Sequence, residues 1–396
     1  MSRLHVTLKP GREKSLLQRH PWIFSGAIAQ VSPTIQDGDI VEVRSNQGDF
    51  LARGYYNSHS QIVIRVLTFS EEEEIDGKFF HRRIQEAYRY RQVYLGLEKI
   101  EAYRLINAEG DHLPGLIVDK YGKFLVVQVL TLGMEKLKDL WLPALRELSD
   151  FRGIYERSDV STRKIEGLSE RIGPLAGEVP DRLLIEEEGI QFWVDLQRGQ
   201  KTGFFLDQRV NRGIVGSYGR NKICLNAFGY TGGFALHLLK NGASQVINLD
   251  SSAEANALAA QNAELNGVTS RLSLNTADAF EALRIYRSQK KSFDLIVLDP
   301  PAFAKNIGSV RRAAQGYKDL NLLSFKLLNP GGILATFSCS HHIDSKLFRQ
   351  IVWEASLDAQ REARIIQTLQ ASPDHTVNLN FPEGEYLKGL LLVVEN

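Results

Sequence analysis

The fold is decided by the stretch Lys222-Ile223-Cys224-Leu225-Asn226-Ala227-Phe228-Gly229-Tyr230-Thr231-Gly232-Gly233, which passes from an apolar run into a glycine-rich turn. The apolar run predicts a strand over 222–225, and Phe234 to Leu239 predicts a helix after the glycines. Glycines at such a turn let the backbone approach a ligand closely. A strand, a glycine turn and a helix in this order are typical of the ligand-binding edge of a parallel α/β sheet.

Two further strands of this region each lead to an acidic residue. The strand Gln245–Leu249 ends at Asp250, whose carboxylate can accept both hydroxyl protons of a ribose. The strand Arg271–Asn275 leads to Asp278, which this order places near an adenine amine. Turn chemistry at strand ends is the alternative explanation for both acids. The succession of glycine loop, ribose acid and adenine acid favours a cofactor that carries a nucleoside.

The glycine spacing separates the candidate cofactors. The chain has neither the Gly-x-Gly-x-x-Gly fingerprint of nicotinamide cofactors nor the Gly-x-x-x-x-Gly-Lys-Ser/Thr loop of triphosphates. S-adenosylmethionine, which has a ribose and an adenine but no phosphate, fits better, and no metal site is expected. The predicted cofactor-binding residues are Asn226, Phe228, Tyr230, Thr231, Gly232, Asp250, Ser251, Asp278, Asp299 and Gln208.

Two strand ends further along the chain carry the candidate catalytic groups. The strand Phe293–Leu298 runs directly into Asp299, and the strand after the turn 329–332 ends in Phe337-Ser338-Cys339. Ligands of an open parallel sheet bind at the carboxyl ends of its strands. Asp299 and Cys339 are therefore predicted to share one pocket, whereas Cys224, inside an apolar run, is predicted to lie in the core.

Length and composition set the broad class. The 396 residues, 43% hydrophobic and 24% charged, suffice for two or three domains with substantial cores. No signal peptide and no apolar run of roughly 20 residues is present, so we expect a cytoplasmic protein without a membrane segment. Two distant cysteines predict reduced thiols rather than a disulfide or a zinc site.

The pattern of elements predicts an α/β protein in four parts. Residues 1–70 contain short strands separated by glycine turns, which predict a small β-barrel. Residues 71–101 predict a helical linker, more easily read as a solvated helix than as an RNA contact. Residues 102–189 predict a compact α+β domain with a helix from Met134 to Leu148. Residues 190–396 alternate strands and helices, as in a doubly wound, Rossmann-like sheet.

Several stretches of the chain match one known family. They are Leu8-Lys9-Pro10-Gly11-Arg12, His20-Pro21-Trp22-Ile23-Phe24, Ile154-Tyr155-Glu156-Arg157-Ser158-Asp159, Thr202-Gly203-Phe204-Phe205-Leu206-Asp207-Gln208-Arg209, Tyr230-Thr231-Gly232-Gly233, Leu298-Asp299-Pro300-Pro301-Ala302-Phe303, Gly316-Tyr317-Lys318-Asp319, Phe337-Ser338-Cys339-Ser340 and Glu385-Tyr386-Leu387-Lys388-Gly389. In these stretches the chain resembles the bacterial large-subunit ribosomal RNA cytosine-C5 methyltransferases of the RlmI type, over essentially its whole length. That resemblance implies an N-terminal PUA domain that binds RNA, a central α+β domain and a class I methyltransferase domain that uses S-adenosylmethionine.

The implied reaction needs a nucleophile, because carbon 5 of cytosine is too electron-poor to attack a methyl group directly. A thiolate that adds at carbon 6 solves this problem, and we assign that role to Cys339. Asp299 can hold the exocyclic amine of the base. Related enzymes with paired cysteines place a second thiol after the prolines, where this chain has Ala302 and Phe303. That departure leaves the base that removes the carbon-5 proton unidentified.

Other residues are predicted to contact RNA. They are Pro300, Pro301 and Phe303 near the site, Lys9 and Arg12 in the basic N-terminus, and Arg157, Arg163 and Lys164 in a hydroxyl-rich loop. A core contact for Phe303 and a solvated turn for the loop are equally good alternatives. His341 and His342 either lower the pKa of the thiol or are structural. For Lys318 and Asp319 a helix N-terminus is a sufficient explanation.

Two other functions compete with this prediction. A methyltransferase directed at an exocyclic nitrogen also suits Asp-Pro-Pro followed by an aromatic residue, and it would not need Cys339. A non-catalytic RNA-binding factor of ribosome assembly would retain the fold without binding the cofactor. The sequence does not name the target nucleotide, and it leaves the oligomeric state open, a homodimer included.

Overall fold

The computed structural model describes residues 4–148, 150–304 and 306–395 and divides the chain into two compact units. The first unit holds the residues up to Leu183 together with Val194–Phe204 and Pro373–Gly384. The second holds Leu184–Trp193, Phe205–Ser372 and the residues from Glu385 onward. The chain therefore crosses between the units after residues 183, 193, 204, 372 and 384. Each unit is described below by itself.

The N-terminal part of the first unit is a six-stranded sheet in the order β2-β6-β5-β4-β1-β3, in which all pairs except β1–β4 are antiparallel. Its central strands β4, β5 and β6 each carry an unbroken run of buried residues, and Val6, Val43 and Ile64 are fully buried in its own core. The elements are β1 (His5–Leu8), α1 (Lys14–Leu17), β2 (Trp22–Phe24), η1 (Ser25–Ala27), β3 (Ile28–Val31), β4 (Ile40–Arg44), β5 (Phe50–Tyr56) and β6 (Ile62–Thr68).

A five-stranded sheet in the order β11-β10-β9-β8-β7 follows, with helices packed on it. Its elements are α2 (Gly77–Arg89), η2 (Tyr90–Tyr94), η3 (Leu97–Lys99), β7 (Ala102–Asn107), η4 (Ala108–Asp111), β8 (Leu116–Tyr121), β9 (Phe124–Val129), α3 (Leu132–Lys136), α4 (Lys138–Glu147), β10 (Gly153–Ser158), α5 (Thr162–Ile165) and β11 (Arg171–Gly177). The helix predicted over 134–148 is thus two helices that meet at Leu137.

Helix α2 is part of this core, although the sequence favoured a solvated linker. Asp76 caps it by accepting a hydrogen bond from the backbone N–H of Phe79 at 2.8 Å. Phe79, Phe80 and Ile84 are buried in the same cluster as the strands of the five-stranded sheet. The apolar face of α2 therefore packs in the core, whereas the sequence interpretation relied on its charged face and expected a solvated helix. The domain bounds given from the sequence stay predictions.

The segment 373–384 belongs to the first unit although it is far away in sequence. Arg91, fully buried, binds the carboxylate of Asp111 and donates to the backbone oxygens of Arg104 at 2.9 Å and Asp374 at 2.7 Å. The ring of Phe381 packs on Trp22 with the centroids 4.7 Å apart. One buried guanidinium and one aromatic contact thus fix this late segment, which we call the strap.

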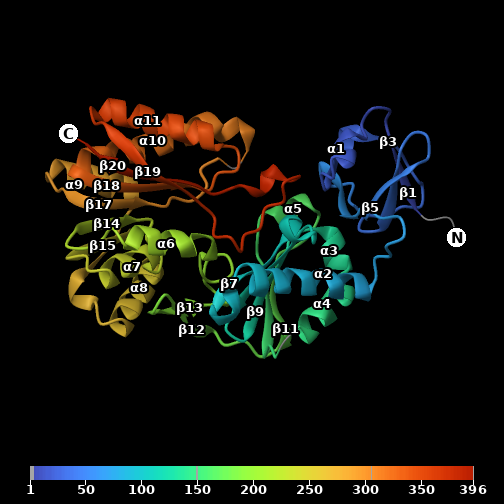
Figure 1. Ribbon diagram of the computed structural model, residues 1–396, viewed down its shortest axis with the longest axis horizontal. Coiled ribbons are helices and arrows are strands. Elements are labelled where there is room, and N and C mark those ends of the chain that lie inside the picture. Colours follow the sequence, from blue (N-terminus) through green and yellow to red (C-terminus); the bar gives the residue numbers. More distant parts are fainter. Residues whose placement is uncertain (1–3, 149, 305, 396) are drawn as a thin grey trace. The chain divides into compact units, whose positions relative to one another are not determined.

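The second unit is built on a seven-stranded sheet in the order β16-β15-β14-β17-β18-β20-β19. The five strands from β16 to β18 are parallel, and β20 runs antiparallel to both of its neighbours. Helices α6, α7 and α8 lie on one face, and α9, α10 and α11 lie on the other (Figure 1). The order reverses direction at β14, and this reversal is where ligands bind in such sheets.

The elements of this part of the chain follow the alternation that the sequence predicted. They are β12 (Arg182–Glu187), β13 (Ile190–Asp195), η5 (Leu206–Gln208), α6 (Arg209–Gly216), β14 (Ile223–Ala227), α7 (Gly233–Lys240), β15 (Gln245–Asp250), α8 (Ala253–Leu265), η6 (Thr269–Arg271), β16 (Leu272–Thr276), α9 (Ala279–Ser288), β17 (Phe293–Leu298), η7 (Ile307–Ser309), α10 (Val310–Leu327), β18 (Leu328–Ser338), α11 (Ser345–Ala359), β19 (Ala363–Gln370), η8 (Pro382–Gly384) and β20 (Lys388–Val394).

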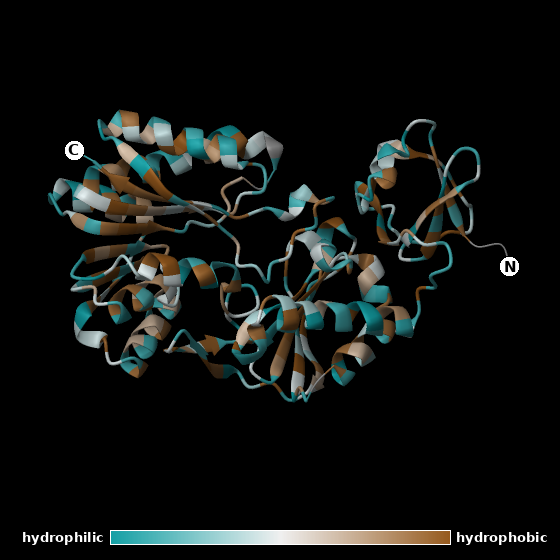
Figure 2. Cartoon of the chain, viewed as in Figure 1, coloured by the Kyte–Doolittle hydropathy of each residue, from teal (hydrophilic) through white to brown (hydrophobic). Residues whose placement is uncertain are grey.

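Hydrophobic residues concentrate on the strands of each sheet (Figure 2). In the second unit, Leu225, Ile296 and Leu334 are fully buried in one cluster with residues of α9, α10 and α11. β14 extends two residues further than predicted, so Asn226 and Ala227 end the strand rather than open the turn. None of the helices that the structure describes is long and apolar enough to cross a membrane.

Replacing Arg91 by leucine should destabilise the first unit by about 3–5 kcal/mol, because the buried carboxylate of Asp111 would lose its guanidinium partner. Urea unfolding followed by circular dichroism measures the loss. The control is Lys123→Ala, which removes an exposed ion pair with Asp150 and should change stability by less than about 0.5 kcal/mol. Equal effects of the two substitutions would show that Arg91 does not anchor the strap.

Candidate active site

The turn after β14 has an unusual backbone. Phe228 and Tyr230 have φ angles of +60° and +45°, and Gly232 has +86°. A left-handed conformation costs a side-chain-bearing residue about 1–3 kcal/mol, so the surroundings must hold it in place. The N–H of Gly229 donates to the carbonyl of Leu249 at 3.0 Å, and the N–H of Gly232 donates to the carbonyl of Gly229 at 2.9 Å. The turn is thereby tied to the end of β15.

Asp250 connects this turn to the next helix. One carboxylate oxygen accepts a hydrogen bond from the backbone N–H of Tyr230 at 2.8 Å, and the other accepts one from that of Ser252 at 2.9 Å. Each oxygen keeps a second lone pair that can accept from a hydroxyl group. The side chain is half-buried, and Ser251 beside it is exposed. This geometry suits the predicted binding of a ribose diol by Asp250.

Buried polar atoms lie beneath the same turn. The amide nitrogen of Asn226 donates to the amide oxygen of Asn248 at 2.8 Å, and that of Asn248 donates to Asn256 at 3.0 Å. Within the described residues, the side-chain oxygens of Asn226 and Thr231 are buried and have no hydrogen-bond partner. Buried polar groups are rarely left unsatisfied, so these atoms mark a place where a polar ligand fits.

Asp278 has a visible structural role. Its side chain caps α9 by accepting from the backbone N–H of Glu281 at 3.1 Å, and the residue is exposed. This is the turn chemistry that the sequence offered as the alternative explanation. The predicted contact with adenine stays a prediction.

Asp299 is held in place by Gln208. The amide nitrogen of Gln208 donates to one carboxylate oxygen of Asp299 at 3.0 Å, and its amide oxygen accepts from Asn211 at 2.6 Å. Gln208 is only 2% exposed, so its orientation is fixed. The sequence placed Gln208 in the wall of the cofactor site but could not show this contact, because the two residues are 91 positions apart.

Cys339 is the first residue after β18, which pairs in parallel with β17. Its sulfur donates to the backbone oxygen of Pro300 at 3.8 Å. Pro300 directly follows Asp299, so the structure brings Cys339 and the Asp-Pro-Pro turn together, as the sequence predicted. Cys339 is half-buried, whereas Cys224 is fully buried and burial raises its pKa to about 12. This difference favours Cys339 over Cys224 as a reactive thiol, and its catalytic role stays a prediction.

Ser340 ties the two turns together and was missed by sequence reasoning. Its hydroxyl accepts from the backbone N–H of Ala304 at 3.1 Å and is hydrogen-bonded to the hydroxyl of Tyr317 at 2.9 Å. The ring of Phe303 packs on that of Tyr317, 4.7 Å between centroids, and is half-buried. This favours the core contact for Phe303, and stacking on a base stays a prediction. Pro300 is buried and Pro301 is exposed.

Of the other residues singled out in this part of the chain, His341 is exposed, and Lys318, Asp319 and His342 are half-buried. Lys318 and Asp319 lie inside α10 rather than at a helix N-terminus, so that explanation was wrong. Lys318 pairs with Asp358 at 2.9 Å and Glu354 at 3.5 Å. The rings of His341 and His342 lie 5.7 Å apart in the turn after Cys339.

The predicted RNA-binding residues of the first unit differ in exposure. Lys9 and Arg12 are exposed, and Arg12 lines a cavity of about 490 Å³ together with Trp22 and Phe24. Lys9 donates to the carbonyl of Gly26 at 3.0 Å at the same place. An exposed basic residue beside an aromatic pocket is a suitable surface for a nucleic acid.

The basic loop around residue 160 is mostly engaged within the protein. Arg157 is 4% exposed and binds Asp159 and the carbonyls of Leu196 and Gly199. Arg163 is 2% exposed and binds Glu135 and the carbonyls of Val129 and Ser169. Lys164 is exposed. RNA contact by this loop stays a prediction, and it now depends on Lys164.

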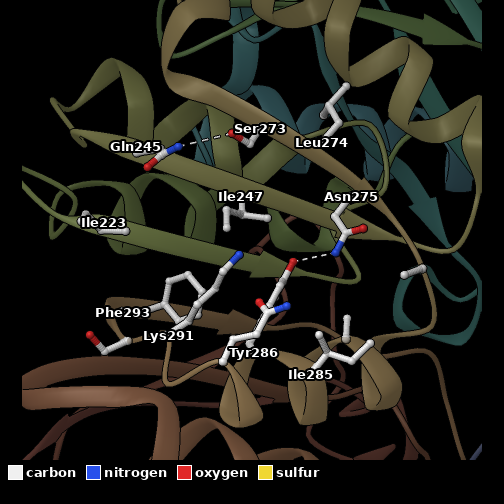
Figure 3. Close-up of a pocket in the computed structure, with 14 residues that line it drawn as sticks. Ile223, Gln245, Ile247, Ser273, Leu274, Asn275, Ile285, Tyr286, Lys291 and Phe293 are labelled. Atoms are coloured by element: carbon white, nitrogen blue, oxygen red, sulfur yellow. Dashed lines mark hydrogen bonds between the residues drawn. The ribbon is translucent and has the colours of Figure 1, made fainter.

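A separate cavity of about 660 Å³ lies between α9 and the face of β14, β15 and β16 (Figure 3). Ile223 and Ile247 line it from the strands, and Ile285 and Tyr286 line it from the helix. None of the predicted site residues lines it. The cavity is therefore distinct from the site formed by Asp299 and Cys339.

Comparison with known families gives one match in the N-terminal part of the chain and another in its C-terminal half. Residues 6–69 match the family profile of a PUA-like domain, and residues 169–375 match that of an S-adenosylmethionine-dependent methyltransferase. The ribosomal RNA large subunit methyltransferase I of Aeromonas salmonicida is 48% identical over 389 residues, 98% of each chain. Enzymes of the same name from Pseudoalteromonas atlantica and Escherichia coli O9:H4 are each 46% identical and cover 98% of this chain and 99% and 98% of theirs.

The chain belongs to the ribosomal RNA large subunit methyltransferase I family. The predicted fold class and the dependence on S-adenosylmethionine are thereby confirmed. A solved Streptococcus mutans chain assigned as a SAM-dependent methyltransferase shares the fold, with a TM-score of 0.84 and 24% identity over 98% of this chain and 100% of that one. A further methyltransferase structure, complexed with SAH, has a TM-score of 0.85, 24% identity and coverage of 99% and 100%.

The residues at the end of β14 and β15 fit this cofactor. Asp250 offers acceptors for the ribose, and the buried oxygens of Asn226 and Thr231 offer polar atoms beside the turn. Gly229 keeps the turn close to the sheet, since an added Cβ would lie 2.1 Å from the amide oxygen of Asn248. The assignment of individual residues to the cofactor is a proposal.

Replacing Gly229 by alanine should weaken the binding of S-adenosylmethionine by at least about tenfold, a cost of roughly 1.4 kcal/mol, because the new methyl group must displace Asn248 or the turn. Isothermal titration calorimetry measures the change. The matched control is Gly77→Ala at the start of α2, where an added Cβ meets nothing within 4 Å. An unchanged dissociation constant for Gly229→Ala would mean that this turn does not shape the cofactor site.

Proposed function

We propose that this protein transfers a methyl group to carbon 5 of a cytosine in large-subunit ribosomal RNA. The supporting observation is the position of Cys339, whose sulfur lies 3.8 Å from the backbone oxygen of Pro300, beside Asp299. The names of the relatives are the reason to propose a ribosomal RNA substrate. The thiol of Cys339 is the reason to propose methylation at carbon 5 rather than at a nitrogen of the base. A methyltransferase directed at an amine would have no use for a thiol at this place.

Cys339 acts as a nucleophile in this proposal. Its thiolate forms a bond to carbon 6 of the ring, and the electrons of the carbon 5–carbon 6 double bond move to carbon 5. Bound S-adenosylmethionine supplies the electrophilic methyl group that carbon 5 takes up. Loss of the carbon-5 proton then restores the double bond and expels the thiolate. The balance is one methyl gained and one proton released by carbon 5, with Cys339 regenerated and S-adenosylhomocysteine, the thioether that remains when the methyl–sulfur bond breaks, as the second product.

Asp299 orients the base in the same pocket. Its carboxylate can accept a hydrogen bond from the exocyclic amine, which cytosine has and uracil lacks. The hydrogen bond from Gln208 fixes one carboxylate oxygen and thus the direction of the other. A base that is paired inside an RNA duplex cannot reach a pocket at the ends of protein β-strands. The target cytosine must therefore be single-stranded or turned out of its stack.

The PUA-like domain supplies RNA affinity in this proposal. Lys9 and Arg12 are exposed next to an aromatic pocket, and they contact phosphates without reading the sequence. A ribosomal RNA substrate supports a cytoplasmic location for the enzyme.

Replacing Cys339 by alanine should abolish the formation of 5-methylcytidine, because no other described thiol lies at the site. The measurement is transfer of labelled methyl groups from S-adenosylmethionine to bacterial large-subunit RNA, followed by nucleoside chromatography. Cys224→Ala, in the core, is the control and should keep its activity. Retained activity in Cys339→Ala, or an N-methylated product, would favour the amine-directed enzyme. No transfer by wild type, together with no cofactor binding, would favour the non-catalytic RNA-binding factor.

RNA that carries 5-fluorocytidine should trap the wild-type protein as a covalent complex, since fluorine at carbon 5 cannot leave as a proton. The complex would appear as a slower band in a denaturing gel. It should be absent with Cys339→Ala and present with Cys224→Ala. A wild-type protein that methylates cytidine at carbon 5 but is never trapped would contradict the covalent route.

The double substitution Lys9→Gln, Arg12→Gln should lower the slope of log affinity against log salt by about 1–2, because each lost phosphate contact releases about one counterion fewer. Filter binding to large-subunit RNA between 50 and 200 mM salt gives the slope. Lys123→Gln, an exposed lysine elsewhere in the same unit, is the control. An unchanged slope in the double variant would remove these residues from the RNA-binding surface.

A further inference from the structure

Lys388 is a buried cation next to the turn that carries Cys339. It is the first residue of β20 and pairs with Ser338, the last residue of β18. Only 7% of the residue is exposed. Its ammonium group donates to the carbonyl of Ser340 at 2.8 Å and to that of Tyr386 at 2.6 Å. The cation thus touches the residue that directly follows Cys339.

These two carbonyls accept from two of the three donors of Lys388 but do not neutralise its charge. Among the ion pairs of the described residues, none includes Lys388. A buried charge without a counter-ion is expensive, so such lysines are uncommon unless they have a purpose. Burial lowers the pKa of Lys388 to about 8, whereas ionised Cys339 and Asp344 act in the opposite direction. The pairing with Ser338 and the contact with the carbonyl of Ser340 place Lys388 against the residues on both sides of Cys339.

We propose that Lys388 is a positioning residue that stabilises Cys339 as a thiolate and fixes the turn that presents it. The inference rests on the proposed function, which makes Cys339 the nucleophile. When the thiol ionises, its proton leaves to solvent and the negative charge remains beside the ammonium group. The same cation stabilises the thiolate a second time, when the carbon–sulfur bond to carbon 6 breaks. Lys388 itself forms no bond to the substrate.

Other ionisable groups surround the thiol. Asp344 is exposed and caps α11 through the backbone N–H of Leu347, so water screens its charge. Burial raises the pKa of Tyr317, which therefore stays neutral near pH 7. His341 and His342 lie on the same turn as Cys339. Lys388 differs from all of them because it is a buried cation from a neighbouring strand.

The test is the pH dependence of the alkylation of Cys339 by iodoacetamide in the full-length protein. Cys339→Ala shows that the signal comes from this thiol, since Cys224 is fully buried. In wild type the midpoint should lie below the ordinary thiol value of about 8.5. In Lys388→Met it should rise by at least about one unit, which lowers the thiolate fraction at neutral pH about tenfold. The rate at pH 7 should fall only about threefold, because a more basic thiolate is a better nucleophile.

Two variants complete the design. Lys388→Arg retains the positive charge and should keep the midpoint low, with partial methyl transfer. Lys346→Met removes an exposed lysine two residues from Asp344 and should leave the midpoint unchanged. Binding of S-adenosylmethionine, measured for every variant, shows whether the second unit is still folded.

An unchanged midpoint in folded Lys388→Met would overturn the proposal. If Lys388→Met does not fold, a wild-type midpoint at or above about 8.5 would overturn it without any variant. The outcome is separable from that of the proposed reaction. If the alkylation midpoint of Cys339 depends on Lys388 in a protein that makes no 5-methylcytidine, the role of Lys388 stands and the proposed methyl transfer is rejected. If the protein makes 5-methylcytidine and the alkylation midpoint of Cys339 does not depend on Lys388, the proposed methyl transfer stands and the role of Lys388 is rejected.

Discussion

The parallel pairing of β17 with β18 is the constraint on which the candidate site depends. Leu298 of β17 pairs with Thr336 of β18, so both strands end at the same edge of the sheet. Asp299 directly follows β17, and Cys339 directly follows β18. Sheet hydrogen bonds fix that spacing without any help from the side chains. Ser340 then locks the two turns to each other, and Gln208 fixes the carboxylate. A flexible loop could not hold the thiol of Cys339 and the carboxylate of Asp299 in so constant an arrangement.

Local patterns were sufficient to predict the strands and the residues at their ends. The strand before Asp299 was predicted with its observed bounds, because its apolar run stops at a proline pair. The glycine turn and Asp250 also lie where the order of the motifs placed them. Such features depend on neighbours in sequence, which one chain displays directly.

Contacts between distant segments could not be predicted in this way. Lys388 contacts the carbonyl of Ser340, 48 residues away, only because β20 inserts between β18 and β19. Arg157 and Arg163 looked like surface bases, yet the carbonyls that bury them come from remote parts of the chain. Helix α2 looked solvated because its charges are conspicuous and its apolar face is short. In each example the deciding partner is set by tertiary packing, which no local pattern reports.

The strap has a consequence for how the chain is made. Residues 373–384 complete the first unit, although they emerge from the ribosome after nearly all of the second unit. Until then Arg91 lacks a backbone partner in Asp374, and Trp22 lacks Phe381. Domains usually fold one after another during synthesis. Here the first unit cannot be completed until residues 373–384, near the end of the chain, have been synthesised. Translation that stops shortly before residue 373 would therefore leave the N-terminal half, fully synthesised, without the contacts that finish it.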